Sequence, residues 1–138
     1  GYLCIVVTNQ PVIARGEVTY EQLDEIHNKM ETLLGLEGAY LDGIYICPHH
    51  PHKGYEGEIP ELKIDCDCRK PKPGMLLRAA KDFNIDLQKS YMVGDSESDI
   101  LAGKAAGCKT VLIGEEDWGQ DFSVTGLPEF VKCEIDNV

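Results

Sequence analysis

The chain has 138 residues, of which 43% are hydrophobic, and it carries a formal net charge of −11. This length fits one domain with a real core and no need for disulfides. No apolar run approaches the roughly 20 residues that cross a membrane. The apolar run at 3–8 is too short for a signal peptide and lacks its basic flank. The acidic charge argues against non-specific nucleic acid binding, which depends on lysine and arginine meeting phosphates, but a local pocket can still be positive enough for a small phosphorylated substrate.

The first predicted elements are a strand and an amphipathic helix. Residues 3–8 form an apolar run with a polar end, which indicates a buried parallel strand. Thr19 and Gln22 have the spacing of a capping box, and apolar residues recur at helical spacing over 20–34. The chain therefore opens with a strand followed by a helix.

A second strand at 43–47 leads into a long loop. Residues 48–72 are rich in proline, glycine, histidine and cysteine. A loop of this length inside a compact domain needs its own support or a function. Pro73 suits the first turn of the helix that follows, which has an apolar side through Phe83.

The last part of the chain repeats the alternation. We predict strands at 91–93 and 110–113, with a helix at 97–106 between them that ends at Gly107. The sequence FVKCEI at 130–135 indicates an edge strand.

This alternation predicts an α/β fold over residues 1–138. Its centre would be a Rossmann-like parallel sheet with helices on both faces. Folds of this kind place their sites at the carboxyl ends of the strands.

The long loop carries a candidate metal site. Cys47-x-His49 and Cys66-x-Cys68 provide three thiolates and one imidazole, which form a good tetrahedral set for zinc. The set leaves no position open for water, so we predict a structural zinc that orders the loop within residues 47–68.

Two alternatives accompany this zinc prediction. His50 or His52 could replace His49 as the imidazole, and the loop could also be flexible with incidental cysteines. The three other thiols, Cys4, Cys108 and Cys133, are scattered. Scattered thiols beside one metal-like cluster favour a reducing cytoplasm over an oxidising compartment.

Two segments are suited to phosphate. Thr8 and Asn9 end the first strand, where a hydroxyl and backbone amides can hold a phosphate oxygen, although such residues also favour plain turns. Arg69 and Lys70 begin a basic cluster in an acidic chain; they can clamp a phosphate or form a solvated turn.

A carboxylate pair follows the strand at 91–93. Asp95 stands at the strand tip, where a carboxylate can hold magnesium together with waters and substrate oxygens. Asp99 lies in the first turn of the next helix, which the helix dipole favours. We take Asp95 as the magnesium ligand and Asp99 as a supporting residue.

Taken together, these segments resemble a known family. The matching segments are VVTNQ (6–10), IARG (13–16), CPHHP (47–51), CDCRKPKPGM (66–75) and YMVGDSESDI (91–100). In this order they resemble the D-glycero-D-manno-heptose 1,7-bisphosphate phosphatases of the haloacid dehalogenase superfamily, with the histidinol phosphatases next. The resemblance covers about residues 3–113.

The resemblance implies a magnesium-dependent sugar phosphatase. Thr8 would bind the transferring phosphoryl group with Asn9 beside it, Lys70 would neutralise charge, Arg69 would help bind substrate, and Asp95 would hold magnesium. The resemblance also implies that the zinc ligands are Cys47, His49, Cys66 and Cys68.

The chain departs from the family at two places. Ser96 stands where the family often has a lysine after its glycine-aspartate motif. The family's Asp-x-Asp-Gly-Thr motif, which supplies the nucleophile and the general acid/base, does not occur; Asp65-Cys66-Asp67 has similar letters but lies in the metal loop. By analogy the missing strand is central, between those at 3–8 and 91–93. We therefore expect it upstream in the same polypeptide, and we expect no phosphatase activity from this chain alone.

Three functions remain open. The leading one is removal of a phosphate from a phosphorylated sugar, with the 7-phosphate of heptose 1,7-bisphosphate as the expected group, through an aspartyl-phosphate. The second is histidinol-phosphate hydrolysis, which the long loop between the ligand pairs disfavours because those relatives tend to have a shorter one. The third is a non-catalytic, zinc-stabilised domain, because the nucleophile motif is absent. None of them calls for nucleic acid or a membrane.

Overall fold

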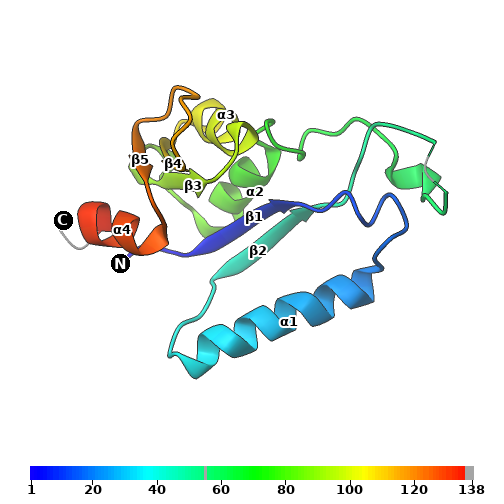
Figure 1. Cartoon of the computed structure of the whole chain (residues 1–138), viewed down its shortest axis with the longest axis horizontal. Coiled ribbons are helices and arrows are strands. Elements are labelled where there is room, and N and C mark those ends of the chain that lie inside the picture. The colour runs from blue at the N-terminus through cyan, green and yellow to red at the C-terminus, as the bar shows by residue number, and fades with distance from the viewer. Residues whose placement is uncertain (55, 136–138) are drawn as a thin grey trace. The chain divides into compact units, whose positions relative to one another are not determined.

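The computed structural model describes residues 1–54 and 56–135, which divide into two compact units. The first unit is Gly1–Arg69 and the second is Lys70–Val138. Parallel strands alternate with helices in both, so the predicted α/β class is confirmed (Figure 1). The strands form two hydrogen-bonded sheets, β1-β2 in the first unit and β3-β4-β5 in the second.

The first unit is built on two parallel strands. Strand β1 (Ile5–Asn9) pairs with β2 (Gly43–Cys47), and Asn9 lies opposite Cys47. Because the strands are parallel, both of these residues stand at the carboxyl edge of the sheet. β2 is the only strand neighbour of β1 among the described residues.

Helix α1 (Tyr20–Leu36) connects the two strands of this unit. The predicted capping box is confirmed: Gln22 N donates to Thr19 Oγ1, and Thr19 N donates to Gln22 Oε1. Of the apolar residues on this helix, Leu23 is buried, whereas Ile26 is 56% exposed. The helix is therefore defined by its local signals more than by burial of an apolar face.

The loop after β2 contains one short 3-10 helix, η1 (Pro60–Leu62). Its backbone is tied to the segment after β1, because Ile59 N donates to Ala14 O. At Gly16, which has a φ of 75°, a Cβ would lie 1.8 Å from the Gly57 carbonyl oxygen, so only glycine allows this approach.

The second unit begins with α2 (Gly74–Phe83) and η2 (Leu87–Lys89). Strand β3 (Tyr91–Gly94), helix α3 (Glu97–Ala106) and strand β4 (Lys109–Ile113) follow as predicted, and Gly107 ends α3 in the left-handed conformation. Pro73, predicted in the first turn of this helix, is instead its N-cap, one residue before α2 begins.

The end of the chain differs from the prediction. The third strand of this sheet is β5 (Phe122–Val124), and it is followed by α4 (Leu127–Phe130) and the π-helical turn η3 (Val131–Ile135). The edge strand predicted at 130–135 is therefore wrong. A proline in the first turn after Gly126 starts a helix, and the helical backbone continues through the apolar residues that suggested a strand.

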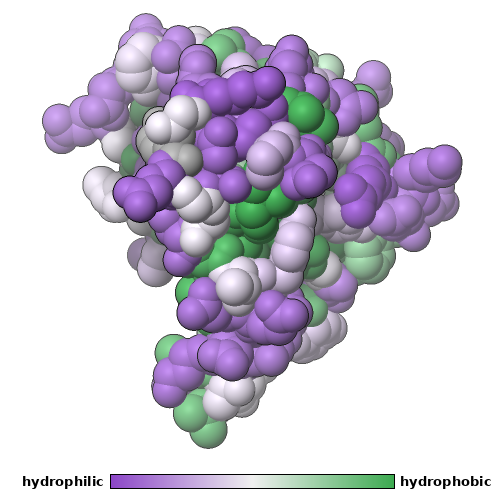
Figure 2. Space-filling view, turned by 90° about the vertical axis from the view of Figure 1, so that its right-hand side faces the viewer, coloured by the Kyte–Doolittle hydropathy of each residue, from purple (hydrophilic) through white to green (hydrophobic). Residues whose placement is uncertain are grey.

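One buried cluster of the second unit joins its sheet to α4. Val111, Val124 and Phe130 form this cluster, and the Tyr91 ring meets Phe130 edge-on at 5.2 Å between ring centroids. On the face seen in Figure 2, apolar side chains lie among mainly hydrophilic ones. Among the helices described, none combines the length and apolar character needed to cross a membrane.

Candidate functional site

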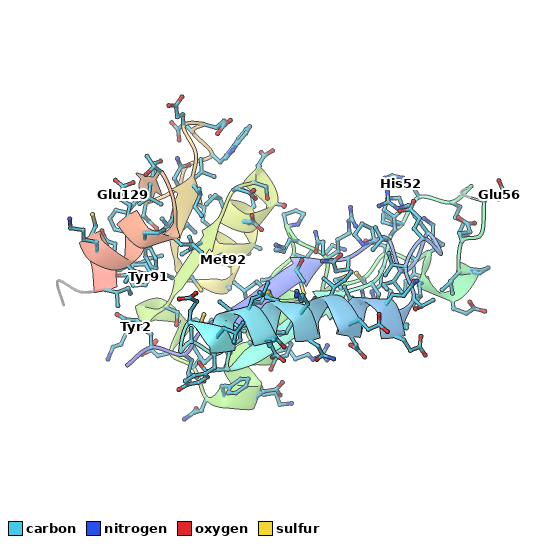
Figure 3. All side chains as sticks on the ribbon, turned by 60° about the horizontal axis from the view of Figure 1, so that its bottom comes forward. Tyr2, His52, Glu56, Tyr91, Met92 and Glu129 are labelled. Atoms are coloured by element: carbon cyan, nitrogen blue, oxygen red, sulfur yellow. The ribbon has the colours of Figure 1, made fainter. Side chains whose placement is uncertain are left out.

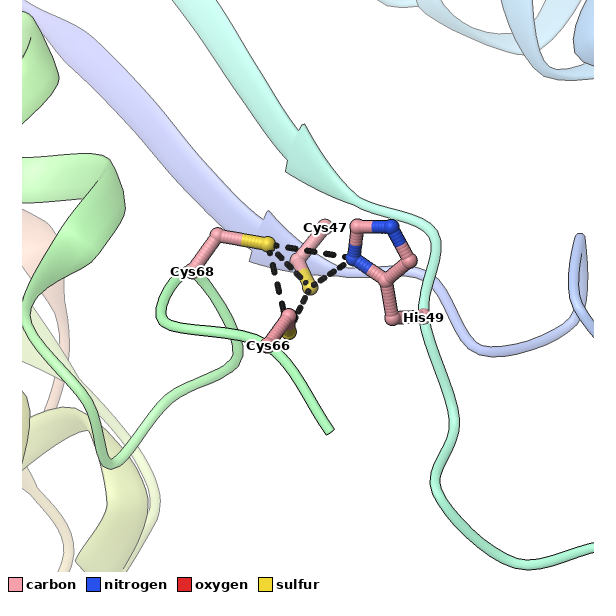
Figure 4. Close-up of side chains that lie close together, drawn as sticks. All are labelled: Cys47, His49, Cys66 and Cys68. Atoms are coloured by element: carbon pink, nitrogen blue, oxygen red, sulfur yellow. Dashed lines mark hydrogen bonds between the residues drawn. The ribbon is translucent and has the colours of Figure 1, made fainter. Parts of the chain in front are cut away.

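Four side chains of the first unit converge after β2. One ligand atom from each of Cys47, His49, Cys66 and Cys68 lies within 4.8 Å of all the others (Figure 4). The Cys66 sulfur is 3.4 Å from each of the other two sulfurs, and His49 Nδ1 is 3.6 Å from Cys47 Sγ and 3.3 Å from Cys68 Sγ. A tetrahedron with zinc–sulfur bonds of about 2.3 Å has edges of about 3.8 Å. The cluster is therefore close to the size that a tetrahedral metal ion requires.

The shortest edge joins Cys47 Sγ and Cys68 Sγ at 2.7 Å. This is longer than a disulfide bond of about 2.05 Å, and all the cysteines are free thiols. Burial raises the pKa of the Cys47 and Cys68 thiols, so both are protonated when no cation is bound. A metal ion must displace these protons, and its affinity will therefore fall as the pH falls.

The structure distinguishes between the three histidines of the loop. His49 belongs to the cluster. The His50 ring is directed to Lys63 instead, with 2.6 Å between Nδ1 and Nζ. His52, labelled in Figure 3, is exposed. Its ring meets the His50 ring edge-on at 5.3 Å between ring centroids. Of these imidazoles, the geometry brings only His49 to the three thiols.

Thr8 and Asn9 lie at the same edge of the β1-β2 sheet as the first metal-cluster residue, Cys47. Thr8 Oγ1 accepts a hydrogen bond of 3.1 Å from Gln10 Nε2, and Gln10 N donates to Cys47 O. The predicted phosphate-binding residues at the end of β1 and the metal cluster are therefore positioned by the same two-stranded sheet.

Arg69 is joined to the metal cluster through two hydrogen bonds. Its backbone N–H donates to Cys66 Sγ, and its guanidinium donates to His49 O, both at 3.3 Å. Sequence reasoning identified Arg69 as a phosphate ligand but gave no sign of these contacts.

In the second unit, Lys70 and Asp99 form an ion pair. Lys70 Nζ lies 2.5 Å from Asp99 Oδ1, and the two side chains are 11% and 8% exposed. Burial alone would raise the pKa of Asp99, but the hydrogen bonds and charge of Lys70, together with Ser96, outweigh it and lower the pKa. Asp99 is therefore held as a carboxylate that fixes the lysine.

Asp95 stands exposed between β3 and α3. Its backbone N–H donates to Asp99 Oδ2, which also accepts from Ser96 N and Ser96 Oγ. A Cβ at Gly94 would lie 2.2 Å from the same Asp99 oxygen, so the turn requires glycine there. This network orients the Asp95 backbone and leaves its carboxylate at the carboxyl end of β3.

The predicted residues are thus divided between the units. Those of Gly1–Arg69 are Thr8, Asn9, Cys47, His49, Cys66, Cys68 and Arg69, and those of Lys70–Val138 are Lys70, Asp95 and Asp99. Asp65-Cys66-Asp67 lies in an irregular segment and not at a strand tip, as expected.

Comparison with known proteins gives one consistent group. The family model described as HAD-hydrolase-like matches residues 67–120. The D-glycero-beta-D-manno-heptose-1,7-bisphosphate 7-phosphatase of Pasteurella multocida (strain Pm70) is 53% identical over 114 residues, which are 82% of this chain and 59% of that protein. The protein of the same name from Yersinia pestis is 46% identical over 145 residues, which cover 96% of this chain and 74% of that protein.

Solved structures agree with these relatives. The crystal structure of a D,D-heptose 1.7-bisphosphate phosphatase from B. bronchiseptica, complexed with magnesium and phosphate, matches with a TM-score of 0.82 and 30% identity. The match covers 99% of this chain and 75% of that one. The chain spans only about 59% of the length of the Pasteurella multocida relative.

Proposed function

We propose that this chain is part of a magnesium-dependent phosphomonoesterase acting on a small phosphorylated sugar, because the chain belongs to the heptose 1,7-bisphosphate phosphatases of the haloacid dehalogenase-like hydrolases. The substrate that its relatives' names support is heptose 1,7-bisphosphate, with hydrolysis at the 7-phosphate. The observation that carries this proposal is the buried Lys70–Asp99 pair next to Asp95 at the carboxyl end of β3.

Each of the predicted phosphate-binding residues then has a chemical role. Thr8 donates a hydrogen bond from its hydroxyl to the phosphoryl group that is transferred, and Asn9 binds substrate beside it. Lys70, held by Asp99, neutralises the negative charge on the phosphate and the nucleophile. Arg69 binds substrate oxygens with its planar guanidinium.

Asp95 is the proposed magnesium ligand. Its exposed carboxylate suits a cation that prefers a few carboxylates together with waters and phosphate oxygens. Bound there, magnesium would stabilise the charge of the phosphoryl group. The chain's own contribution is to hold the Asp95 backbone through Asp99.

We assign the cluster of Cys47, His49, Cys66 and Cys68 to zinc. Three thiols and an imidazole of this size favour zinc over the hard cations, and four protein ligands leave no position for water. The zinc is therefore structural, within a loop spanning 47–68. Such a site requires reduced cysteines, which supports a cytoplasmic setting.

The Asp-x-Asp-Gly-Thr motif, which supplies the nucleophile in the family that the chain resembles, does not occur in these 138 residues. We propose that the reaction uses such a motif, supplied by a strand that these residues do not include. Its first aspartate attacks phosphorus to form an aspartyl-phosphate as the sugar hydroxyl leaves, and its second protonates that leaving oxygen and then activates water.

Phosphate release tests this proposal. With magnesium and zinc, the chain alone should release no phosphate from heptose 1,7-bisphosphate. The chain extended at its N-terminus by the Asp-x-Asp-Gly-Thr strand of a relative should release it, and Lys70→Met in that extended protein should abolish the release.

Other outcomes would favour the alternatives. Faster hydrolysis of histidinol phosphate than of the heptose would identify a histidinol-phosphate phosphatase. An extended, folded, zinc-loaded protein that hydrolyses neither substrate would identify a non-catalytic domain. Turnover by the 138-residue chain itself would contradict the placement of the nucleophile outside it.

A further inference from the structure

The loop between the two pairs of metal-cluster residues contains a buried lysine that the proposed reaction does not use. The Lys63 side chain is fully buried. Its Nζ lies 2.6 Å from His50 Nδ1 and 3.9 Å from Glu58 Oε2. Burying an ammonium group is costly unless it is paired and hydrogen-bonded. A buried lysine of this kind does not act as a solvent-exposed surface charge, so its contacts within the loop must explain its position.

His50 is joined to the same turn by its main chain. Its backbone N–H donates to Leu62 O at 3.1 Å, and the residue is only 7% exposed. His50 Nδ1 lies 2.6 Å from Lys63 Nζ and 3.2 Å from the His52 carbonyl oxygen, so both of its partners belong to the same loop. In this arrangement Nδ1 is not available to a metal ion. Residue 50 is thus linked to residues 62–63 through both backbone and side chain.

The backbone and side-chain links between residue 50 and residues 62–63 bring the two ends of the metal loop together. His50 directly follows His49, and Lys63 precedes Cys66 by three residues, so the link lies just within the two pairs that form the cluster. Ordering a backbone costs conformational entropy at every residue that becomes fixed. A loop that is closed beforehand leaves less of this cost to be met by metal binding.

We propose that Lys63 is a positioning residue that pre-organises the metal loop through His50 and so increases its affinity for zinc without touching the ion. Glu58 supports the arrangement by holding the other side of the loop, since its Oε2 accepts from Gly54 N at 3.1 Å. This inference rests on the proposed zinc site.

The first test compares Lys63→Met with Lys53→Met. Both replace a lysine of the same loop with an uncharged side chain of similar length, but Lys53 is exposed. Zinc affinity is measured by competition with a chromogenic chelator. Lys63→Met should bind zinc about 10–100-fold more weakly, the range typical of lost outer-sphere partners, and Lys53→Met should bind like the wild type.

The second test asks whether Lys63 acts through His50. In a double-mutant cycle with His50→Leu, the double variant should lose little more zinc affinity than either single variant. Cobalt at saturating concentration should give the same tetrahedral absorption bands in wild type and Lys63→Met, because the ligands are unchanged. Should Lys63→Met fail to fold, His50→Leu tests the same link from its other side.

Several outcomes would overturn the inference. Equal zinc affinity of wild type and Lys63→Met would do so, as would fully additive losses in the cycle. A wild-type chain that binds no zinc would instead overturn the proposed metal site, and the inference with it.

Discussion

At the residue scale, the cysteines of this chain differ in what surrounds them. Cys47, Cys66 and Cys68 share one cluster, whereas Cys4 is exposed and Cys108 is partly buried in the second unit. Burial raises the pKa of Cys108 as it does that of Cys47. Within the part of the chain that the structure describes, one group of side chains could hold a metal ion, and it contains these three clustered thiols, so they should respond to zinc.

Cys66→Ser should remove zinc from the chain. Serine keeps the size of the side chain but offers no thiolate, so the affinity should fall by more than the roughly 10–100-fold that follows loss of an outer-sphere partner. Metal content after dialysis, measured by mass spectrometry, provides the test. Cys4→Ser is the matched control, and equal zinc content in both variants would rule out a role for Cys66.

Glu129 provides a prediction about pH. Its Oε2 accepts from Thr125 N at 2.6 Å and from Thr125 Oγ1 at 2.7 Å, and these bonds lower its pKa. The bonds therefore stabilise the fold above the ordinary glutamate pKa, and the benefit is lost as the pH falls through the lowered value.

Thr125→Val removes the hydroxyl and leaves the backbone donor. The Glu129 midpoint, followed by carbon-13 NMR during a pH titration, should move upward toward the ordinary glutamate value. Ser123→Ala is the control, because the Ser123 hydroxyl accepts from Gln120 Nε2. A midpoint that does not move in Thr125→Val would show that the hydroxyl has no part in the shift.

At the element scale, α3 packs closely on its sheet. Gly103 makes this approach possible: a Cβ there would lie 2.7 Å from Met92 Cβ on β3 and 2.8 Å from Thr110 Cγ2 on β4. Both neighbours are buried, so neither can move away easily. The turn that presents Asp95 lies at the other end of the same helix, and its position depends on this contact.

Gly103→Ala should therefore destabilise the protein despite the better helix propensity of alanine. Overpacking of this kind costs about 1–3 kcal/mol. Gly35→Ala in α1 has nothing within 4 Å of the added methyl, and it should stabilise by up to about 1 kcal/mol. Urea unfolding of both variants tests the contrast, and a stabilised Gly103→Ala would show that α3 can shift.

The elements that the sequence predicted well have local signals. Thr19 and Gln22 determine the start of α1, and Gly107 determines the end of α3, through contacts within a few residues. β5 was missed because three residues are too short for a pattern. The stretch at 130–135 was misread because an apolar run fits a strand or a helix equally well. The links of Lys63 to His50 and of Arg69 to His49 join residues distant in the chain, and no local pattern indicates them.

At the scale of the whole molecule, the two compact units carry different parts of the predicted chemistry. Every residue of the metal cluster belongs to Gly1–Arg69, whereas the Lys70–Asp99 pair belongs to Lys70–Val138. The sequence indicated both sets of residues, but the division between Arg69 and Lys70, two neighbours in one basic cluster, has no sequence signal.

Removal of zinc should affect the units unequally. After treatment with a chelator, backbone amides of residues 47–69 should lose protection from hydrogen exchange, because the loop loses the ion that ties its ends together. Amides of β3 and β4 should keep theirs. Added zinc should restore the protection and added magnesium should not; uniform loss over the chain would show that the whole fold depends on the metal.

The register of β1 and β2 has a consequence for folding fidelity. Cys47 is the last residue of β2, it is fully buried, and it lies opposite Asn9. Successive side chains of a strand point to opposite faces, so a slip of one residue would turn the Cys47 sulfur away from its three partners. A misaligned pairing would then lack a complete set of ligands. Zinc binding would therefore stabilise the correct register selectively, because only correctly aligned strands bring Cys47 to the other ligands.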